Sequence, residues 1–177
     1  MYLKSLDECQ LKIGSYPKFS YNAVGGGGKA TLVPTKKTNN KRYVSFSSET
    51  FSIPPLTSQT TKFLSLPLPP GIKISMSMDK LEGSVDNNSG EVLLEFESKF
   101  VLSIGSVIKF PDLLVKTLLQ TGQVKGQLHQ GKGLSLQKNG KTKLVGIAII
   151  PPTGNKFLDT FLGLPNEALA ELQCEIQ

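Results

Sequence analysis

The sequence contains no tryptophan, one histidine and two cysteines in 177 residues. Because His129 is alone, no site that requires two imidazoles can form, and neither a zinc nor an iron centre is predicted. Cys9 and Cys174 are too few for a disulfide framework. They predict a reducing compartment, either the cytoplasm or the stroma or matrix of an organelle. The sequence predicts no cofactor and no catalytic residue.

Positive charge comes almost entirely from lysine. The formal net charge is +6, and Arg42 is the only arginine. Lysine gives a diffuse positive field, whereas arginine recognises phosphates and guanine edges through paired hydrogen bonds. Aromatic residues make up 7% of the chain, too few to predict a platform for stacked bases. The composition therefore argues against nucleic acid as a partner.

Long apolar runs are also absent. No stretch is long enough to span a membrane, and the N-terminal MYLKSLDECQ lacks the apolar centre of a signal peptide. The sequence therefore predicts a soluble protein without a transmembrane segment. A chain of this length fits one domain, residues 1–177, with a single core.

Apolar and polar residues alternate along much of the chain. In GIKISMSM every second residue from 72 to 78 is apolar, and in EVLLEFESKFVLSI the even positions from 92 to 104 are apolar except Ser98. The DNNSG segment between them, 86–90, is typical of a turn. A period of two predicts strands with one dry face and one wet face. These two stretches therefore form a predicted hairpin.

Other segments add to the predicted sheet. Asn139-Gly140 favours a two-residue hairpin turn with positive φ at both central positions. Further strand candidates are 19–24, 30–33, 42–53, 60–66 and 124–129. With the two terminal segments this gives roughly ten strands, more than a single half-covered sheet usually holds.

Two regions are candidates for helices. Residues 111–122 begin with Pro-Asp and end near glycine, as a helix would, yet their valine and threonine also fit a strand, and both interpretations stay open. Asn155 would cap a short helix that ends near Leu162, and Pro165-Asn166 would open another turn. Either helix would be an accessory to the sheet.

The two ends of the chain resemble each other. DECQLKIG and AELQCEIQ both alternate, with one cysteine on the apolar face of each. If these segments are the two edges of a curled antiparallel sheet, pairing them removes both edges and closes a barrel. Cys9 and Cys174 would then face inward, near one another. The alternative is a two-layer β-sandwich with both termini at edges.

We therefore predict a mainly β protein: a single-domain antiparallel β-barrel with one or two short accessory helices. The architecture would resemble that of lipocalin, YceI and allene-oxide-cyclase barrels, an analogy of fold.

The motifs that would indicate catalysis do not hold. AVGGGGKAT fails as a phosphate loop, because Ala23 stands where the first glycine belongs and Ala30 where serine or threonine belongs. The four glycines are instead predicted to form a turn or a sheet distortion. Cysteine–histidine chemistry would need His129 beside a thiol, and cysteines on apolar strand faces are usually buried hydrophobes. The predicted protein is a binding module without catalysis.

The apolar inward faces predict the ligand. We expect a lipid, isoprenoid or pigment inside the barrel, in contact with methionine and phenylalanine side chains. The candidate lining residues are Ile74, Met76, Met78, Phe96, Phe100 and Leu102. The same side chains would otherwise fill a solid core. The alternative function is an interaction or assembly factor that docks on a protein or membrane complex through basic residues, with Lys36, Lys37, Lys41 and Arg42 as candidates.

Overall fold

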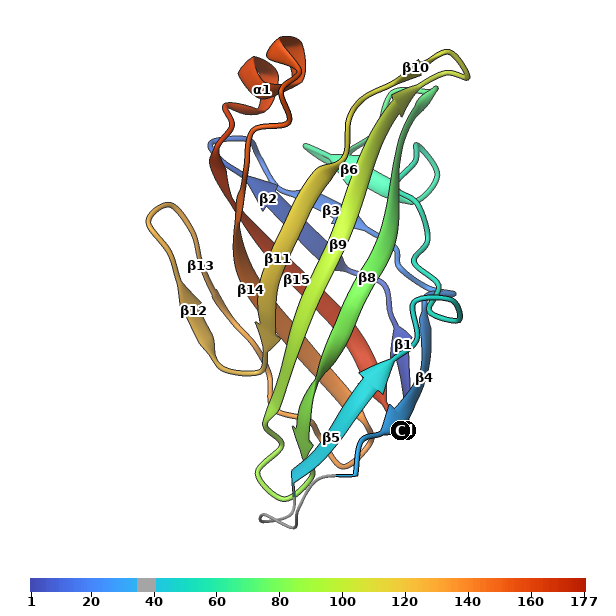
Figure 1. Ribbon diagram of the computed structural model, residues 1–177, viewed down its shortest axis with the longest axis vertical. Helices are drawn as coiled ribbons and strands as arrows, with labels where there is room; N and C mark the ends of the chain where they lie inside the picture. Colours follow the sequence, from blue (N-terminus) through green and yellow to red (C-terminus); the bar gives the residue numbers. More distant parts are fainter. Residues whose placement is uncertain (35–40) are drawn as a thin grey trace.

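The computed structural model describes residues 1–34 and 41–177. As predicted, the chain is mainly β, and its antiparallel strands form a closed ring (Figure 1). In order around the ring the strands are β1 (Tyr2–Ser5), β4 (Gly27–Leu32), β5 (Lys41–Phe46), β8 (Ile72–Asp86), β9 (Val92–Ile104), β11 (Leu113–Gln120), β14 (Lys141–Ile150) and β15 (Asn166–Ile176). The ring favours the barrel over the sandwich.

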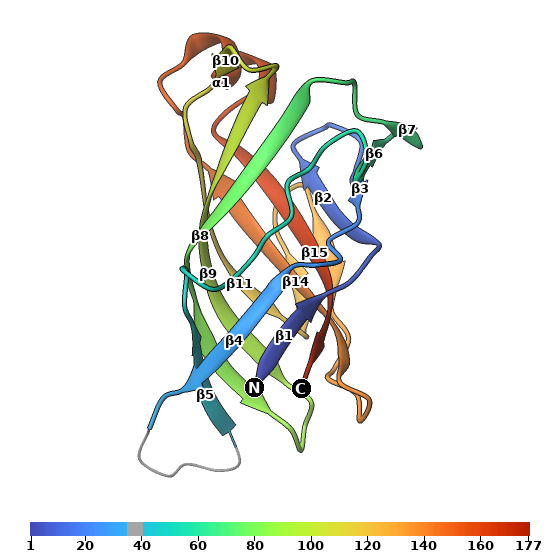
Figure 2. The same cartoon turned by 90° about the vertical axis from the view of Figure 1, so that its right-hand side faces the viewer.

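The first and last strands close the ring, as predicted, but the first strand is Tyr2–Ser5 and not the segment 7–14 that resembles the C-terminal end. β1 pairs with β15, with Leu3 opposite Ile176 and Ser5 opposite Cys174. β2 (Cys9–Ile13) continues along the same edge of β15 and places Leu11 opposite Ala170. Both termini consequently lie at one end of the barrel (Figure 2).

We call the end with the two termini the lower end. The upper end carries β10 (Ile108–Lys109), which pairs with β9, and the helix α1 (Lys156–Leu162) (Figure 2). In the upper half the sheet also extends beyond β2 through β3 (Phe19–Tyr21), β6 (Thr61–Phe63) and β7 (Leu66–Pro67). β12 (Gln123–Lys125) and β13 (Gln130–Lys132) form a separate hairpin outside the ring.

The predicted hairpin of β8 and β9 contains one irregularity. The pairing is regular from Ile72 to Met78 and again from Lys80 to Val85, with Asp79 as the extra residue of a β-bulge. The bulge explains why the apolar positions of β8 change from even numbers above it to odd numbers below it, such as Leu81 and Val85. It keeps both sets facing inward and adds local twist.

The packed core lies in the lower half of the barrel. Its buried members come from every strand of the ring, and they include Leu3, Ala30, Val44, Leu81, Val85, Val92, Leu94, Leu119, Leu144, Cys174 and Ile176. Leu94 and Leu144 are completely inaccessible to solvent. Complete burial of a leucine stabilises the fold by roughly 2 kcal/mol.

Of the two regions predicted as candidate helices, one is a strand and the other is a helix. Residues 113–120 form strand β11, because Leu113, Val115, Thr117 and Leu119 alternate toward the interior and the strand pairs with β9 along its whole length. Helix α1 is confirmed, and the side chain of Asn155 caps it by accepting the N–H of Leu158. The second turn predicted at Pro165-Asn166 is wrong, because Asn166 already begins β15.

One predicted turn type and two predicted strand boundaries are also wrong. The Asn139-Gly140 turn is not of the type with two positive φ values: Gly140 alone has φ +83, and Asn139 Oδ1 accepts the N–H of Lys141. The strand predicted over 42–53 ends at Phe46, where Ser47 O accepts the N–H of Phe51 and turns the chain. The strand predicted over 124–129 is interrupted because a carboxylate binds the backbone of 127–129, as described below.

The junction between β11 and β14 has the fewest ladder pairs of the ring. Only Gln120 and Val145 form a ladder pair across it. Above that pair, the hydroxyl of Thr117 donates to Ile147 O at 2.8 Å. Nearer the upper end, the rings of Phe110 and Phe157 stack at 5.8 Å, which ties α1 to the chain before β11.

Candidate functional site

The inward-facing side chains differ between the two halves of the barrel. On β8, Met78, Leu81 and Val85 are buried, whereas Ile74 and Met76 nearer the upper end are only half-buried. The same gradient runs along β9 and β11. The half-buried set, which we call the upper interior, is Leu11, Ile13, Phe19, Ile74, Met76, Phe100, Leu102, Leu113, Val115, Ala168 and Ala170. These side chains face the barrel axis and are only partly covered, whereas Ala148 and Ile150 on β14, which face the same way, are buried.

Small residues line one wall of the barrel. β14 and β15 place Gly146 opposite Ala170 and Ala148 opposite Ala168. Residues of this size project little into the interior. At Gly146 that space is taken by β11, because a Cβ atom there would lie 2.7 Å from Thr117 Oγ1 and 3.1 Å from a methyl carbon of Leu119.

The polar groups near the upper interior are already bonded. The Ser98 hydroxyl donates to Ser77 O at 2.7 Å, and Asn166 Nδ2 donates to Leu162 O at 2.9 Å. With these groups occupied, the upper interior offers mainly apolar contact. Phe19 and Phe63, whose ring centroids are 4.8 Å apart, add a flat aromatic surface from β3 and β6.

The candidate lining residues divide between the two halves. Ile74, Met76, Phe100 and Leu102 lie in the upper interior, where the sequence predicted a ligand. Met78 is buried within the core. Phe96 is half-buried and packs against that core. Sequence reasoning did not identify the contributions of β3 and β15. The alternation of 170–176 already indicated an inward face on β15, but nothing marked Phe19.

Both cysteines face the interior and carry free thiols. Cys9 Sγ accepts the N–H of Gln173, the residue next to Cys174, so the two thiol-bearing strands are in contact. Burial raises the pKa of Cys9 to about 11, although hydrogen bonds and the nearby Tyr21 partly oppose the effect. Burial also raises the pKa of Cys174. The thiols are therefore protonated at neutral pH and poor nucleophiles.

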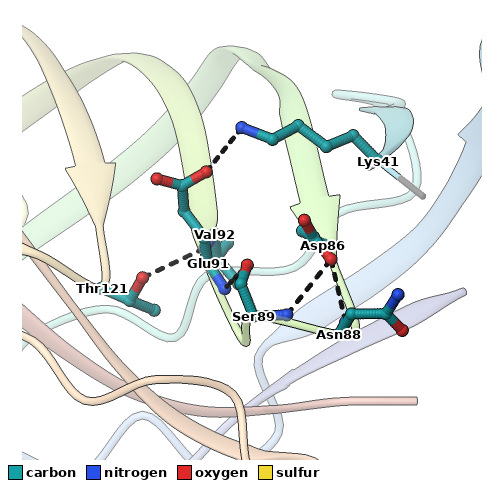
Figure 3. Close-up of polar contacts among 7 residues, drawn as sticks. All are labelled: Lys41, Asp86, Asn88, Ser89, Glu91, Val92 and Thr121. Atoms are coloured by element: carbon teal, nitrogen blue, oxygen red, sulfur yellow. Dashed lines mark hydrogen bonds and ion pairs between the residues drawn. The ribbon is translucent and has the colours of Figure 1, made fainter. Parts of the chain in front are cut away.

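The basic candidates lie at the lower end. Lys36 and Lys37 are outside the described residues, and Lys41 Nζ forms an ion pair with Glu91 at 2.6 Å (Figure 3). Asp86 beside this pair accepts the N–H groups of Asn88 and Ser89, which hold the pKa of its carboxyl below the usual value. Arg42 lines a pocket of about 530 Å³ between the turns at 87–90 and 136–140. Its other walls combine the polar side chains of these turns with the apolar Met1, Leu136 and Ile176.

The β12–β13 hairpin is held to the barrel wall by one carboxylate. Glu167 on β15 is 5% exposed and accepts the backbone N–H groups of Gln127, Leu128 and His129 at 2.6–3.0 Å. Burial opposes ionisation of this carboxyl, but the three N–H donors outweigh it, so the pKa of Glu167 lies below its usual value. Below the carboxylate, Val124 packs on Val145 and Leu169.

We expect Glu167→Gln to destabilise the protein by about 2 kcal/mol at neutral pH, because charge-assisted hydrogen bonds to buried N–H groups are replaced by weaker ones. Since the folded-state pKa is lowered, this contribution is complete above the ordinary pKa of glutamate and is lost as pH falls through the folded-state pKa. Melting temperatures measured across the acid range should show the unmodified protein and Glu167→Gln becoming equally stable as pH falls. Glu49→Gln, in an exposed turn, is the control and should leave the curve unchanged.

Fold and site together define a closed antiparallel β-barrel whose upper interior is lined by half-buried apolar side chains. No family model, no curated protein and no solved structure matches the chain. Among residues 1–34 and 41–177, no cluster of histidine, cysteine or acidic side chains is suited to hold a metal ion. In that same part of the chain, the structure contains no helix with the length and apolar character needed to cross a membrane.

Proposed function

We propose that the protein binds an apolar small molecule, such as a lipid, an isoprenoid or a pigment, in the upper interior. The observation that supports this most directly is the gradient of exposure along β8, β9 and β11. On these strands the inward apolar side chains are mostly buried below and half-buried above, so part of their apolar surface stays accessible to solvent. Covering such surface with a ligand is favourable by roughly 25 cal/mol for each Å² removed from water.

The chemistry of the upper interior favours a ligand without charge in its buried part. The half-buried lining consists of aliphatic, methionine and aromatic side chains, and the adjacent serine and asparagine groups are already hydrogen-bonded. A buried ionic group would find no partner there and would carry a large desolvation cost. Any polar head of the ligand would therefore point to the upper end.

The alternative function, docking through the basic cluster, has less support. Lys41 is paired with Glu91, and the remaining lysines of that cluster fall outside the described residues. The argument for a ligand rests instead on described side chains with known orientation.

Titration with a fluorescent polyene fatty acid, cis-parinaric acid, tests the proposal. Because the chain has no tryptophan, probe fluorescence is free of energy transfer from that residue. Saturable enhancement at one probe per chain is expected. Ala168→Phe should weaken binding roughly tenfold, because the ring occupies the upper interior. Absence of saturable binding by the unmodified protein would overturn the proposal.

Ile149→Phe is the matched control. Ile149 lies on β14 next to Ala148, but it faces outward and is 61% exposed. The variant introduces the same phenylalanine side chain outside the barrel, while the interior is unchanged, so probe affinity should stay the same. An equal loss in both variants would mean that the probe binds the outer wall.

A further inference from the structure

Large apolar side chains are exposed at the upper end of the barrel on three separate projections. We define the upper rim as Leu64 and Leu66 at the β6–β7 turn, Val107 and Ile108 at the β9–β10 turn, and Phe157 and Phe161 on α1. All six are at least 48% exposed, and Val107 reaches 89%. Figures 1 and 2 show that these projections, far apart in the sequence, lie toward the same end.

On two of the projections the local backbone structure keeps the apolar side chains exposed to solvent. Leu64 has φ +52 and Ser65 has φ +65 at the tip between Phe63 and Leu66. Such positions favour asparagine or glycine, so leucine there is costly and gains no burial. On α1, Leu158 is fully buried and anchors the helix, while Phe157 and Phe161 stack on each other at 6.0 Å on its exposed side.

Lysines accompany the apolar side chains. Lys62, Lys73, Lys109 and Lys156 are exposed on the same projections or at the adjoining start of β8. None of them takes part in an ion pair among the described residues. Two carboxylates lie at the same end: Asp159, which accepts hydrogen bonds from Thr153 and the N–H of Gly154, and the exposed Asp112 just before β11. The four lysines outnumber these two acids, so the rim combines apolar tips with a net positive charge.

We propose that the upper rim docks on the surface of a lipid bilayer that contains anionic lipids. Apolar tips that enter the headgroup region, with lysines around them, provide the two contributions that hold peripheral proteins at membranes. A protein partner fits less well, because energetically important protein contacts are rich in tryptophan, tyrosine and arginine and poor in lysine. Docking here would turn the upper end of the barrel toward the bilayer. The inference does not depend on whether the upper interior holds a ligand.

Co-sedimentation with vesicles tests the docking. The protein should bind vesicles of phosphatidylcholine mixed with phosphatidylserine, and should bind pure phosphatidylcholine or high-salt samples much more weakly. Leu64→Asn should reduce binding roughly tenfold through the loss of one inserted side chain. The same change suits the turn, so the melting temperature should stay the same or rise. Lys73→Gln combined with Lys109→Gln should reduce binding roughly tenfold and flatten the dependence on anionic lipid.

Leu118→Ser is the matched control, because Leu118 is 42% exposed on the outer wall of β11, away from the rim. It should bind like the unmodified protein. The proposal is overturned if the unmodified protein ignores both kinds of vesicle, if binding is independent of anionic lipid and salt, or if Leu118→Ser weakens binding as much as Leu64→Asn. Self-association that Leu64→Asn abolishes, without vesicle binding, would instead assign the rim to a second copy of the chain.

Discussion

Gly27→Ala is expected to lower the free energy of unfolding by about 4 kcal/mol, enough to unfold a marginally stable domain. Gly27 begins β4 with φ +122, a region that side chains rarely adopt. A Cβ atom there would lie 2.0 Å from the carbonyl oxygen of Leu3 on the paired strand β1. The backbone of Gly27 is also bonded in both directions to Ser52, so neither strand is free to move away. Urea unfolding followed by circular dichroism measures the loss.

Gly25→Ala is the control for this prediction, because it changes the same glycine-rich segment without a clash. Gly25 also has a positive φ, +94, but no atom lies within 4 Å of the position of its Cβ. Only the backbone preference is lost, and we expect a cost of about 1 kcal/mol. If both variants lost the same stability, the close approach of β1 and β4 would not be the reason why glycine is needed at position 27.

Leu94→Ala is expected to destabilise the protein by about 3 kcal/mol, the usual cost of a cavity in a packed core. Leu94 is completely buried, faces Leu119 across β9 and β11, and belongs to the core of the lower half. Met76→Ala removes an inward side chain of similar size from the upper interior, where the neighbours are already exposed. It should cost about 1 kcal/mol, because little packing is lost.

The comparison of these two variants also bears on the proposed ligand. If Met76→Ala were as costly as Leu94→Ala, the upper half would be as tightly packed as the lower half, and no space for a ligand would remain. Added cis-parinaric acid should raise the melting temperature of the unmodified protein, since a ligand that binds only the folded state stabilises it. The gain should be smaller in Met76→Ala, which loses a contact with the probe.

The architecture could be predicted from the sequence because the alternation of apolar and polar residues along a strand is a local property. The even-numbered apolar residues of 72–78 and 92–104 already indicated the β8–β9 hairpin. The similar ends indicated the pairing of β2 with β15 and closure by the first and last strands, but not that β1 is the strand that closes the ring. Turns were harder to predict, because their conformation depends on which side chains form hydrogen bonds with the backbone. Asn139 binds the N–H of Lys141 instead of adopting positive φ, and Glu167, some forty residues away, determines where β12 ends.

The candidate site could be predicted only in part, for a related reason. Alternation shows that Met76 and Met78 share a face, but it does not show how far along the barrel the packing extends. That depends on which residues lie opposite, and the small side chains of Gly146, Ala148 and Ala168 come from strands distant in sequence. The upper rim was missed because its members are isolated apolar residues in turns, which are unremarkable until the fold brings them to one end.

The bulge at Asp79 has a consequence for the permitted length of β8. Met78 and Leu81 both point inward only because the extra residue separates two regular segments. Removing Asp79 would restore simple alternation and keep every apolar side chain of β8 inside. Removing one residue well above or below that point would instead turn part of the strand inside out. The strand therefore has one place at which a single-residue deletion is compatible with the barrel.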